Sequence, residues 1–120
     1  IEVDLSERQI RLFRGSELVL ETPTAIGKPS TPTPLGRYYV NQRLPAPDPR
    51  GPFGPAAVGI SAFSPTLVNW AQGGPIAIHG TNDPSSIGLP VSNGCLRIAN
   101  DQIVRLFELA AEGTPVVIRA

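Results

Sequence analysis

Cysteine, histidine and methionine are nearly missing from this chain of 120 residues, which contains one, one and none of them. A single cysteine excludes an internal disulfide bridge, and one cysteine with one histidine provides too few ligands for a zinc site. We expect no metal and no other cofactor. Basic and acidic residues are equal at ten each, so no excess of charge favours nucleic acid or an anionic membrane as a partner.

Long apolar runs are also absent. None reaches the roughly 18 residues of a membrane-spanning helix, and no signal peptide is present. Because position 1 is not methionine, we expect the numbering to begin inside a longer gene product, whose earlier part would hold any signal or anchor. No sequence feature indicates an oligomer, and we expect a monomer.

Proline and glycine, in contrast, are frequent, with 14 and 12 residues. Their share stays below the roughly 25–30% that is typical of disordered chains, and many of them cluster in residues 22–36 and 44–55. We interpret these clusters as ordered loops between short strands. With 41% hydrophobic residues the chain can bury a core, and its length suits one compact domain over residues 1–120.

Alternation of apolar and polar residues predicts a mostly β fold. Strands are expected over residues 1–5, 9–14 and 17–21 as an antiparallel meander, and over 37–41, 56–61, 75–79 and 114–119. Residues 64–74 form a connection, with Trp70 expected to pack over one end of the sheet.

One clear helix is expected near the C-terminus, over residues 102–111. Asn100 or Asp101 would cap its start, and Gly113 would serve as its C-cap. The expected buried face is spaced at i, i+3, i+4 and i+7 and consists of Ile103, Leu106, Phe107 and Ala110.

The lone cysteine and the lone histidine stand in suggestive surroundings. Cys95 lies in Ser92-Asn93-Gly94-Cys95-Leu96-Arg97, and His79 ends the apolar segment 75–79. A thiol becomes a nucleophile when a neighbouring base takes its proton, and His79 is the only imidazole in the chain. The alternative is that both side chains merely pack in the core, because free cysteine is often buried.

The residues next to this pair fit the same chemistry. Backbone N–H groups of Asn93, Gly94 and Cys95 are candidates for an oxyanion hole. Ser92 would either hydrogen-bond within the loop or touch the substrate. Arg97 would either bind a substrate carboxylate or form a bracing ion pair with an acidic residue.

A third group must orient the imidazole ring of His79. Two candidates remain open from the residues alone, the side chain of Asp83 and a backbone carbonyl near Gly80.

Taken together, these motifs resemble the L,D-transpeptidase catalytic domain, also called the YkuD domain. That family pairs His-Gly with Ser-X-Gly-Cys-X-Arg about sixteen residues later, and here the two motifs are His79-Gly80 and 92–97. Segments 27–36 and 51–54 and the opening hairpin also resemble family sequence, so that the likeness covers nearly the whole chain. Asn93 is a departure, because many members have histidine there.

The resemblance implies a YkuD-like β-sandwich and an exported enzyme of the cell envelope or periplasm that acts on peptidoglycan stem peptides. Cys95 would attack the third residue of a tetrapeptide donor, expel the terminal D-Ala, and pass the acyl group from its thioester to the side-chain amine of an acceptor stem. The product would be a 3→3 cross-link. His79 would be base and then acid, with the Gly80 carbonyl holding its ring, and Ser92 and Arg97 would support the loop and the substrate.

Such enzymes are commonly acylated by carbapenems. Three alternatives stay open at this point. Water as the acceptor would make the protein an L,D-carboxypeptidase, and a related enzyme would attach a protein to the wall or release one. A peptidoglycan-binding module with an idle site is the non-enzymatic alternative.

Overall fold

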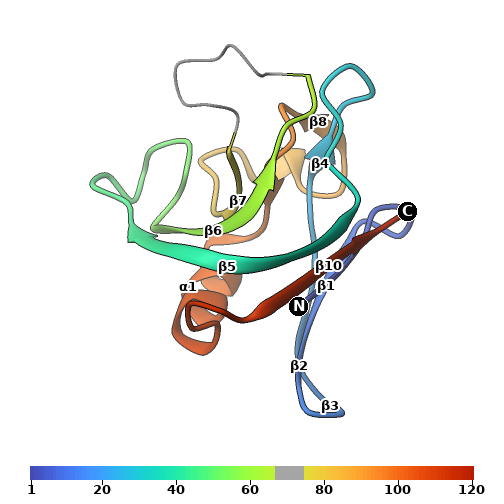
Figure 1. The fold of residues 1–120 in the computed structure, drawn as a ribbon. Coiled ribbons are helices and arrows are strands. Elements are labelled where there is room, and N and C mark those ends of the chain that lie inside the picture. Colours follow the sequence, from blue (N-terminus) through green and yellow to red (C-terminus); the bar gives the residue numbers. More distant parts are fainter. Residues whose placement is uncertain (67–74) are drawn as a thin grey trace.

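The computed structural model describes residues 1–66 and 75–120, and strands dominate it (Figure 1). The elements, in chain order, are β1 (Glu2–Asp4), β2 (Gln9–Arg14), β3 (Glu17–Pro23), β4 (Ile26–Gly27), β5 (Gly36–Pro45), β6 (Ala56–Phe63), β7 (Pro75–His79), the 3₁₀ turn η1 (Pro84–Ser86), β8 (Pro90–Ser92), β9 (Leu96–Arg97), α1 (Asn100–Leu109) and β10 (Pro115–Arg119). Eight strands form one curled sheet in the order β3-β2-β1-β10-β5-β6-β7-β9, and β4 pairs with β8 in a second, two-stranded sheet. The mostly β fold with one helix is therefore confirmed.

The predicted meander at the start of the chain is present. β1 pairs with β2 and β2 with β3, both antiparallel. Gly15 turns the chain between β2 and β3 with φ at +61°, a conformation that costs glycine little. β10 returns beside β1 in parallel, and the N-terminal amine of Ile1 donates a hydrogen bond to the Pro115 carbonyl at 2.8 Å.

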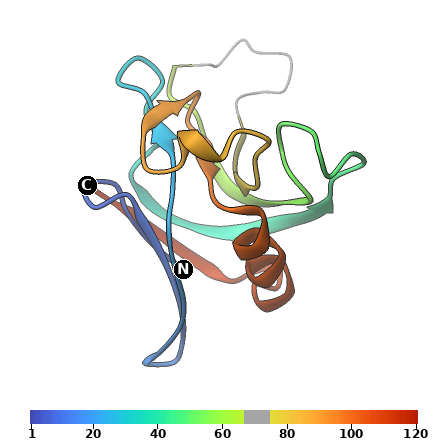
Figure 2. The ribbon, with the colours of Figure 1, turned by 180° about the vertical axis from the view of Figure 1, so that it is seen from behind.

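The core lies between the curled sheet and α1, which packs against β6 and β7 on the face opposite the hollow of the sheet (Figure 2). Buried and less buried residues alternate along β6, as the period of a strand requires. The predicted face of α1 is confirmed, because Ile103, Leu106 and Ala110 are fully buried and Phe107 packs against the same cluster. Each fully buried large aliphatic side chain contributes about 1.5–3 kcal/mol to folding.

Both ends of α1 differ from the prediction. The helix begins at Asn100, two residues early, and no side chain caps it, because the Asn100 side chain binds a different loop. It ends at Leu109, since Ala110 is already extended. Gly113 is not its C-cap. That residue lies in the following turn with φ at +91°, and its N–H donates to the Val40 carbonyl at 2.7 Å.

The remaining differences concern strand length. β5 runs to Pro45 and enters the expected second loop, because its last residues pair with the start of β6. β4, β8 and β9 have only two or three residues, too few for a periodic pattern to reveal. The prediction for Trp70 lies outside the described residues.

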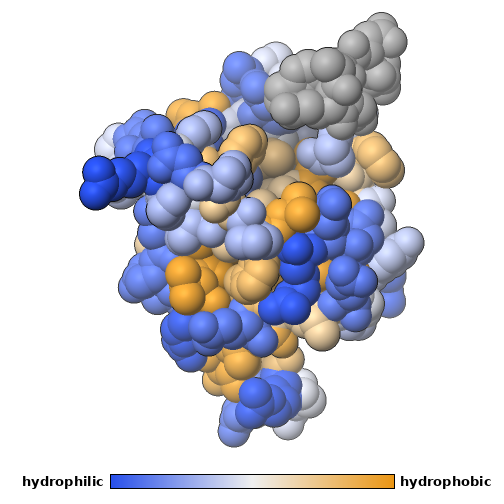
Figure 3. Space-filling view, turned by 90° about the vertical axis from the view of Figure 1, so that its left-hand side faces the viewer, coloured by the Kyte–Doolittle hydropathy of each residue, from blue (hydrophilic) through white to orange (hydrophobic). Residues whose placement is uncertain are grey.

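The surface is mixed in polarity. Figure 3 shows apolar side chains exposed between polar ones on one side of the molecule. Within the described ranges, no helix is long and apolar enough to span a membrane.

Candidate active site

Strand pairing brings the lone histidine and the lone cysteine together. β7 ends at His79, as predicted, and β9 begins directly after Cys95. The two strands are parallel neighbours, with Ile78 opposite Leu96. One step back along each strand places Cys95 beside Ala77, and Ala77 shares a strand face with His79. Both side chains line one hollow of about 250 Å³.

The ring of His79 is held from two directions. Nδ1 contacts the Gly80 carbonyl, and the ring of Phe53 lies edge-on at 4.8 Å between centroids and 82° between planes. Because a carbonyl only accepts, Nδ1 carries the proton and Nε2 keeps its lone pair. Of the two open candidates, the backbone carbonyl orients the ring. The Asp83 carboxylate accepts a hydrogen bond from Ser85 instead.

The environment favours the neutral form of both groups. Burial lowers the pKa of His79, with a smaller lowering from the charge of Arg97, and the Gly80 carbonyl partly opposes both. Burial raises the pKa of the Cys95 thiol, although a backbone hydrogen bond at Ala77 and the charge of Arg97 act in the other direction. At neutral pH the pair is therefore a thiol and an imidazole, and the proton has to move when the thiol attacks.

The loop before Cys95 requires glycine at position 94. Gly94 has φ at +121°, and a Cβ there would lie 2.9 Å from Cδ1 of Ile76. Its N–H donates to the Ser92 hydroxyl at 3.0 Å, and that hydroxyl donates to the Cys95 carbonyl at 2.6 Å. These bonds close the loop into a tight turn.

One expectation needs correction here. The Gly94 N–H is already engaged, so it does not belong to an oxyanion hole. Of its two expected roles, Ser92 fills the one within the loop, because its hydroxyl is engaged twice there. Ser92 is 1% exposed but also lines the smaller hollow, and its contact with substrate stays a prediction. Within residues 1–66 and 75–120, the N–H groups of Asn93 and Cys95 have no hydrogen-bond partner and stay available.

Arg97 brings the positive charge of the site. It follows Cys95 by two residues, is half-buried in β9 and lines the same hollow. Among the described residues no carboxylate pairs with it. Of its two expected roles, the bracing ion pair is thus absent from this part of the chain.

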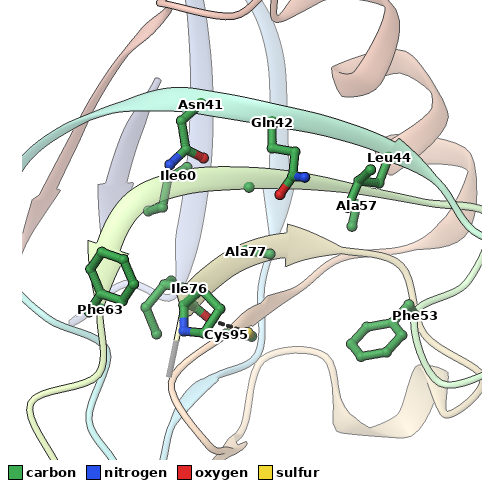
Figure 4. Close-up of a pocket in the computed structure, with 12 residues that line it drawn as sticks. Asn41, Gln42, Leu44, Phe53, Ala57, Ile60, Phe63, Ile76, Ala77 and Cys95 are labelled. Atoms are coloured by element: carbon green, nitrogen blue, oxygen red, sulfur yellow. Dashed lines mark hydrogen bonds between the residues drawn. The ribbon is translucent and has the colours of Figure 1, made fainter. Parts of the chain in front are cut away.

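A second hollow, of about 370 Å³, lies on the other side of Cys95 (Figure 4). Its floor is the concave face of β5, β6 and β7, with Phe63 and Phe53 at opposite ends. A dashed line in Figure 4 joins the thiol to the Pro75 carbonyl, 3.9 Å away. Cys95 and Phe53 line both hollows, so that the thiol stands where the two meet.

Sequence reasoning missed two residues of this site. Phe53 lies in the segment 51–54, which resembles family sequence, but no local pattern ties it to His79. Asn100 is a predicted helix cap, but its Oδ1 accepts a hydrogen bond from the Thr81 N–H at 2.8 Å. It thereby ties the start of α1 to the turn that follows His79. The described residues contain no cluster of three or more potential metal ligands.

Comparison with known proteins agrees with the motifs. The family model of the L,D-transpeptidase catalytic domain, YkuD, matches residues 1–118. The chain belongs to the L,D-transpeptidase family. The YkuD protein of Bacillus licheniformis is 38% identical over 118 residues, which cover 98% of this chain and 64% of that protein. The chain thus spans about two thirds of the length of this relative.

Solved structures share the fold. An L,D-transpeptidase from Mycobacterium smegmatis superposes with a TM-score of 0.78 at 21% identity, over 99% of this chain and 57% of that one. The L,D-transpeptidase LdtMt1, solved in complex with imipenem, gives a TM-score of 0.72 at 20% identity, over 98% of this chain and 57% of that one. At these identities the likeness establishes the architecture of the L,D-transpeptidase domain.

Proposed function

We propose that this L,D-transpeptidase domain uses Cys95 as a nucleophile to form 3→3 cross-links between peptidoglycan stem peptides. The observation that carries the proposal is the pairing of β7 with β9, which puts a thiol and an imidazole with a free Nε2 in one hollow. Family membership supplies the substrate class. The proposal includes a monomeric enzyme that works outside the cytoplasm, in the cell envelope.

In the first half-reaction, Nε2 of His79 takes the proton of the Cys95 thiol as Sγ attacks the carbonyl carbon of the third stem residue. The tetrahedral oxyanion accepts hydrogen bonds from the N–H groups of Asn93 and Cys95. The imidazolium then gives its proton to the amine of D-Ala, which leaves as the C–N bond breaks. A thioester on Cys95 remains.

In the second half-reaction, the side-chain amine of an acceptor stem attacks the thioester carbonyl. His79 takes a proton from that amine and returns it to Sγ as the C–S bond breaks. The free thiol is restored, and an amide joins the two stems. A hollow on each side of Cys95 supports a reaction in which two peptides approach one sulfur.

Mass spectrometry on a purified tetrapeptide stem in ¹⁸O-labelled water tests the proposal. A stem dimer with one D-Ala released per dimer, and no label in the new bond, is the expected result. Tripeptide that carries ¹⁸O in its carboxylate would assign the carboxypeptidase reaction instead. If no D-Ala is released, the protein is not an L,D-transpeptidase for this stem.

The variants Cys95→Ala and His79→Ala separate catalysis from packing. Both are expected to lose the dimer and the covalent adduct with imipenem, a probe suggested by the complex of LdtMt1. Both should keep the circular dichroism spectrum and a cooperative unfolding transition, because both side chains line a hollow and neither belongs to the hydrophobic cluster. Loss of folding in either variant would favour the core-packing alternative.

A further inference from the structure

A buried segment underneath the catalytic loop holds that loop by two threonine hydroxyls. Thr31 donates a hydrogen bond from Oγ1 to the Ser92 carbonyl at 3.0 Å. Thr33 donates from Oγ1 to the Gly94 carbonyl at 2.8 Å. Both threonines are buried, with 8% and 4% of their surface exposed, and neither touches the hollows beside Cys95.

Each of these carbonyls belongs to a peptide unit whose N–H faces the other way. A peptide bond is planar and trans, so its C=O and N–H point in opposite directions and rotate as one body. The Ser92 carbonyl is in the same plane as the Asn93 N–H, and the Gly94 carbonyl is in the same plane as the Cys95 N–H. A hydrogen bond to the carbonyl therefore fixes the direction of the N–H beyond it.

These are the two N–H groups of the loop that lack a partner within the described ranges. The Gly94 N–H, in the peptide between them, turns back to the Ser92 hydroxyl. The threonine bonds thus act on the two peptides that have a free donor.

We propose that Thr31 and Thr33 are positioning residues that aim the Asn93 and Cys95 N–H groups at the oxyanion of the reaction. The inference rests on the proposed acylation of Cys95. Aimed donors matter because an oxyanion hole stabilises the transition state only when its donors already point at the developing charge.

The segment that contains the two threonines is itself fixed in place. The Thr33 hydroxyl also accepts a hydrogen bond from the Gly27 N–H at 3.0 Å, and the Lys28 N–H donates to the Ser92 carbonyl at 3.0 Å. A Cβ on Gly27 would lie 2.3 Å from the Thr31 carbonyl, so the segment folds back on itself without spare room. It therefore provides a rigid support for the two carbonyls.

Two reactions of the same thiol distinguish aiming from general support. Acylation by imipenem passes through an oxyanion, whereas alkylation by iodoacetamide displaces iodide from a carbon atom and forms none. Both need Cys95 in place and both proceed through its thiolate. Only acylation needs the two N–H groups.

The experiment compares Thr33→Val and Thr31→Val with the wild type, with Thr33→Ser as the conservative variant and Thr22→Val as the matched control. Thr22 is a buried threonine of β3 whose hydroxyl lies 3.3 Å from the Pro23 carbonyl, away from the catalytic loop. Thr33→Val is expected to slow acylation about tenfold to a hundredfold, somewhat less than outright loss of one oxyanion donor. Thr31→Val is expected to slow it measurably but less, because the Lys28 N–H still holds the Ser92 carbonyl. Alkylation should change by less than about twofold, since it makes no use of those donors.

Thr33→Ser should restore acylation, and Thr22→Val should leave both rates unchanged. Unfolding midpoints identify variants that lose stability. If Thr33→Val does not fold, the comparison of acylation with alkylation is made on Thr31→Val. Equal losses of both rates in a folded variant, or no loss in either, would overturn the inference. If the wild type itself is alkylated but never acylated, by imipenem or by a stem, the proposed function fails first and this inference fails with it.

Discussion

Gly54 and Gly15 offer a matched pair for measuring how tightly the histidine turn is packed. Their φ angles are +60° and +61°, so an alanine at either position meets nearly the same backbone strain, about 1–2 kcal/mol. Their surroundings differ completely. No atom lies within 4 Å of a Cβ built on Gly15, whereas one built on Gly54 lies 2.4 Å from Oδ1 of Asn100 and 2.8 Å from both Cα of Gly80 and N of Thr81.

Two of those three contacts are backbone atoms of the turn after His79, so the overlap cannot be relieved by rotating a side chain. Overpacking of this kind costs about 1–3 kcal/mol, and we expect Gly54→Ala to lose that much more unfolding free energy than Gly15→Ala. Because the turn contains the carbonyl that orients His79, we expect Gly54→Ala also to slow acylation of Cys95, and Gly15→Ala to leave it unchanged.

Urea denaturation followed by circular dichroism gives both free energies, and imipenem acylation gives the rates. Subtracting the loss of unfolding free energy in Gly15→Ala from the loss in Gly54→Ala removes the backbone strain that both variants share. The difference is the cost of overpacking the turn after His79. Equal destabilisation of the two variants would refute the reasoning, since it would mean that the turn yields to the added methyl group without cost.

Three further predictions concern ionisable groups. Because burial raises the pKa of the Cys95 thiol, we expect the rate of its alkylation by iodoacetamide to keep rising above pH 9.0, and thiolate absorbance that titrates below pH 9.0 would contradict this. Because burial lowers the pKa of His79, we expect the rate of acylation to fall on the acid side only below pH 6.5. The Glu7 N–H and the Ser6 hydroxyl hold the pKa of Asp4 at about 2, so its carboxylate stabilises the fold above pH 3.8 and loses that effect as the pH falls through 2. Asp4→Asn should therefore lower the urea midpoint at pH 7 and match the wild type at the acid end, and an unchanged midpoint at pH 7 would exclude this role. Phe53→Ala should expose the only imidazole and move its pKa up toward 6.5, which NMR can follow as a single histidine signal, with little change in stability because Phe53 is already 48% exposed.

Much of the fold was accessible from the sequence because its larger elements have periodic patterns. β2, β6 and β7 alternate or run apolar, and the buried face of α1 follows helical spacing. The short strands β4 and β9 were not accessible. They exist because distant segments pair with them, as Ala25 does with Arg97, and two residues contain no period.

The candidate site, too, could be predicted only in part. A unique thiol and a unique imidazole in glycine-flanked motifs pointed to Cys95 and His79. Roles that depend on partners far along the chain were not visible. Asparagine is a preferred residue at the start of a helix, yet the Asn100 side chain accepts a hydrogen bond from the Thr81 N–H, 19 positions away. Thr33 reaches a carbonyl 61 positions away, and no local rule relates the two.

The parallel pairing of β1 with β10 has a mechanical consequence. The first strand of the chain lies beside the last, with Val3 opposite Ile118, and the two run in the same direction. A force that pulls the two ends of the chain apart therefore acts along both strands in opposite senses and shears their shared ladder. In that geometry the hydrogen bonds bear the load together and must break together, whereas strands peeled from one end lose them singly. The fold is thus braced against tension applied through its own termini.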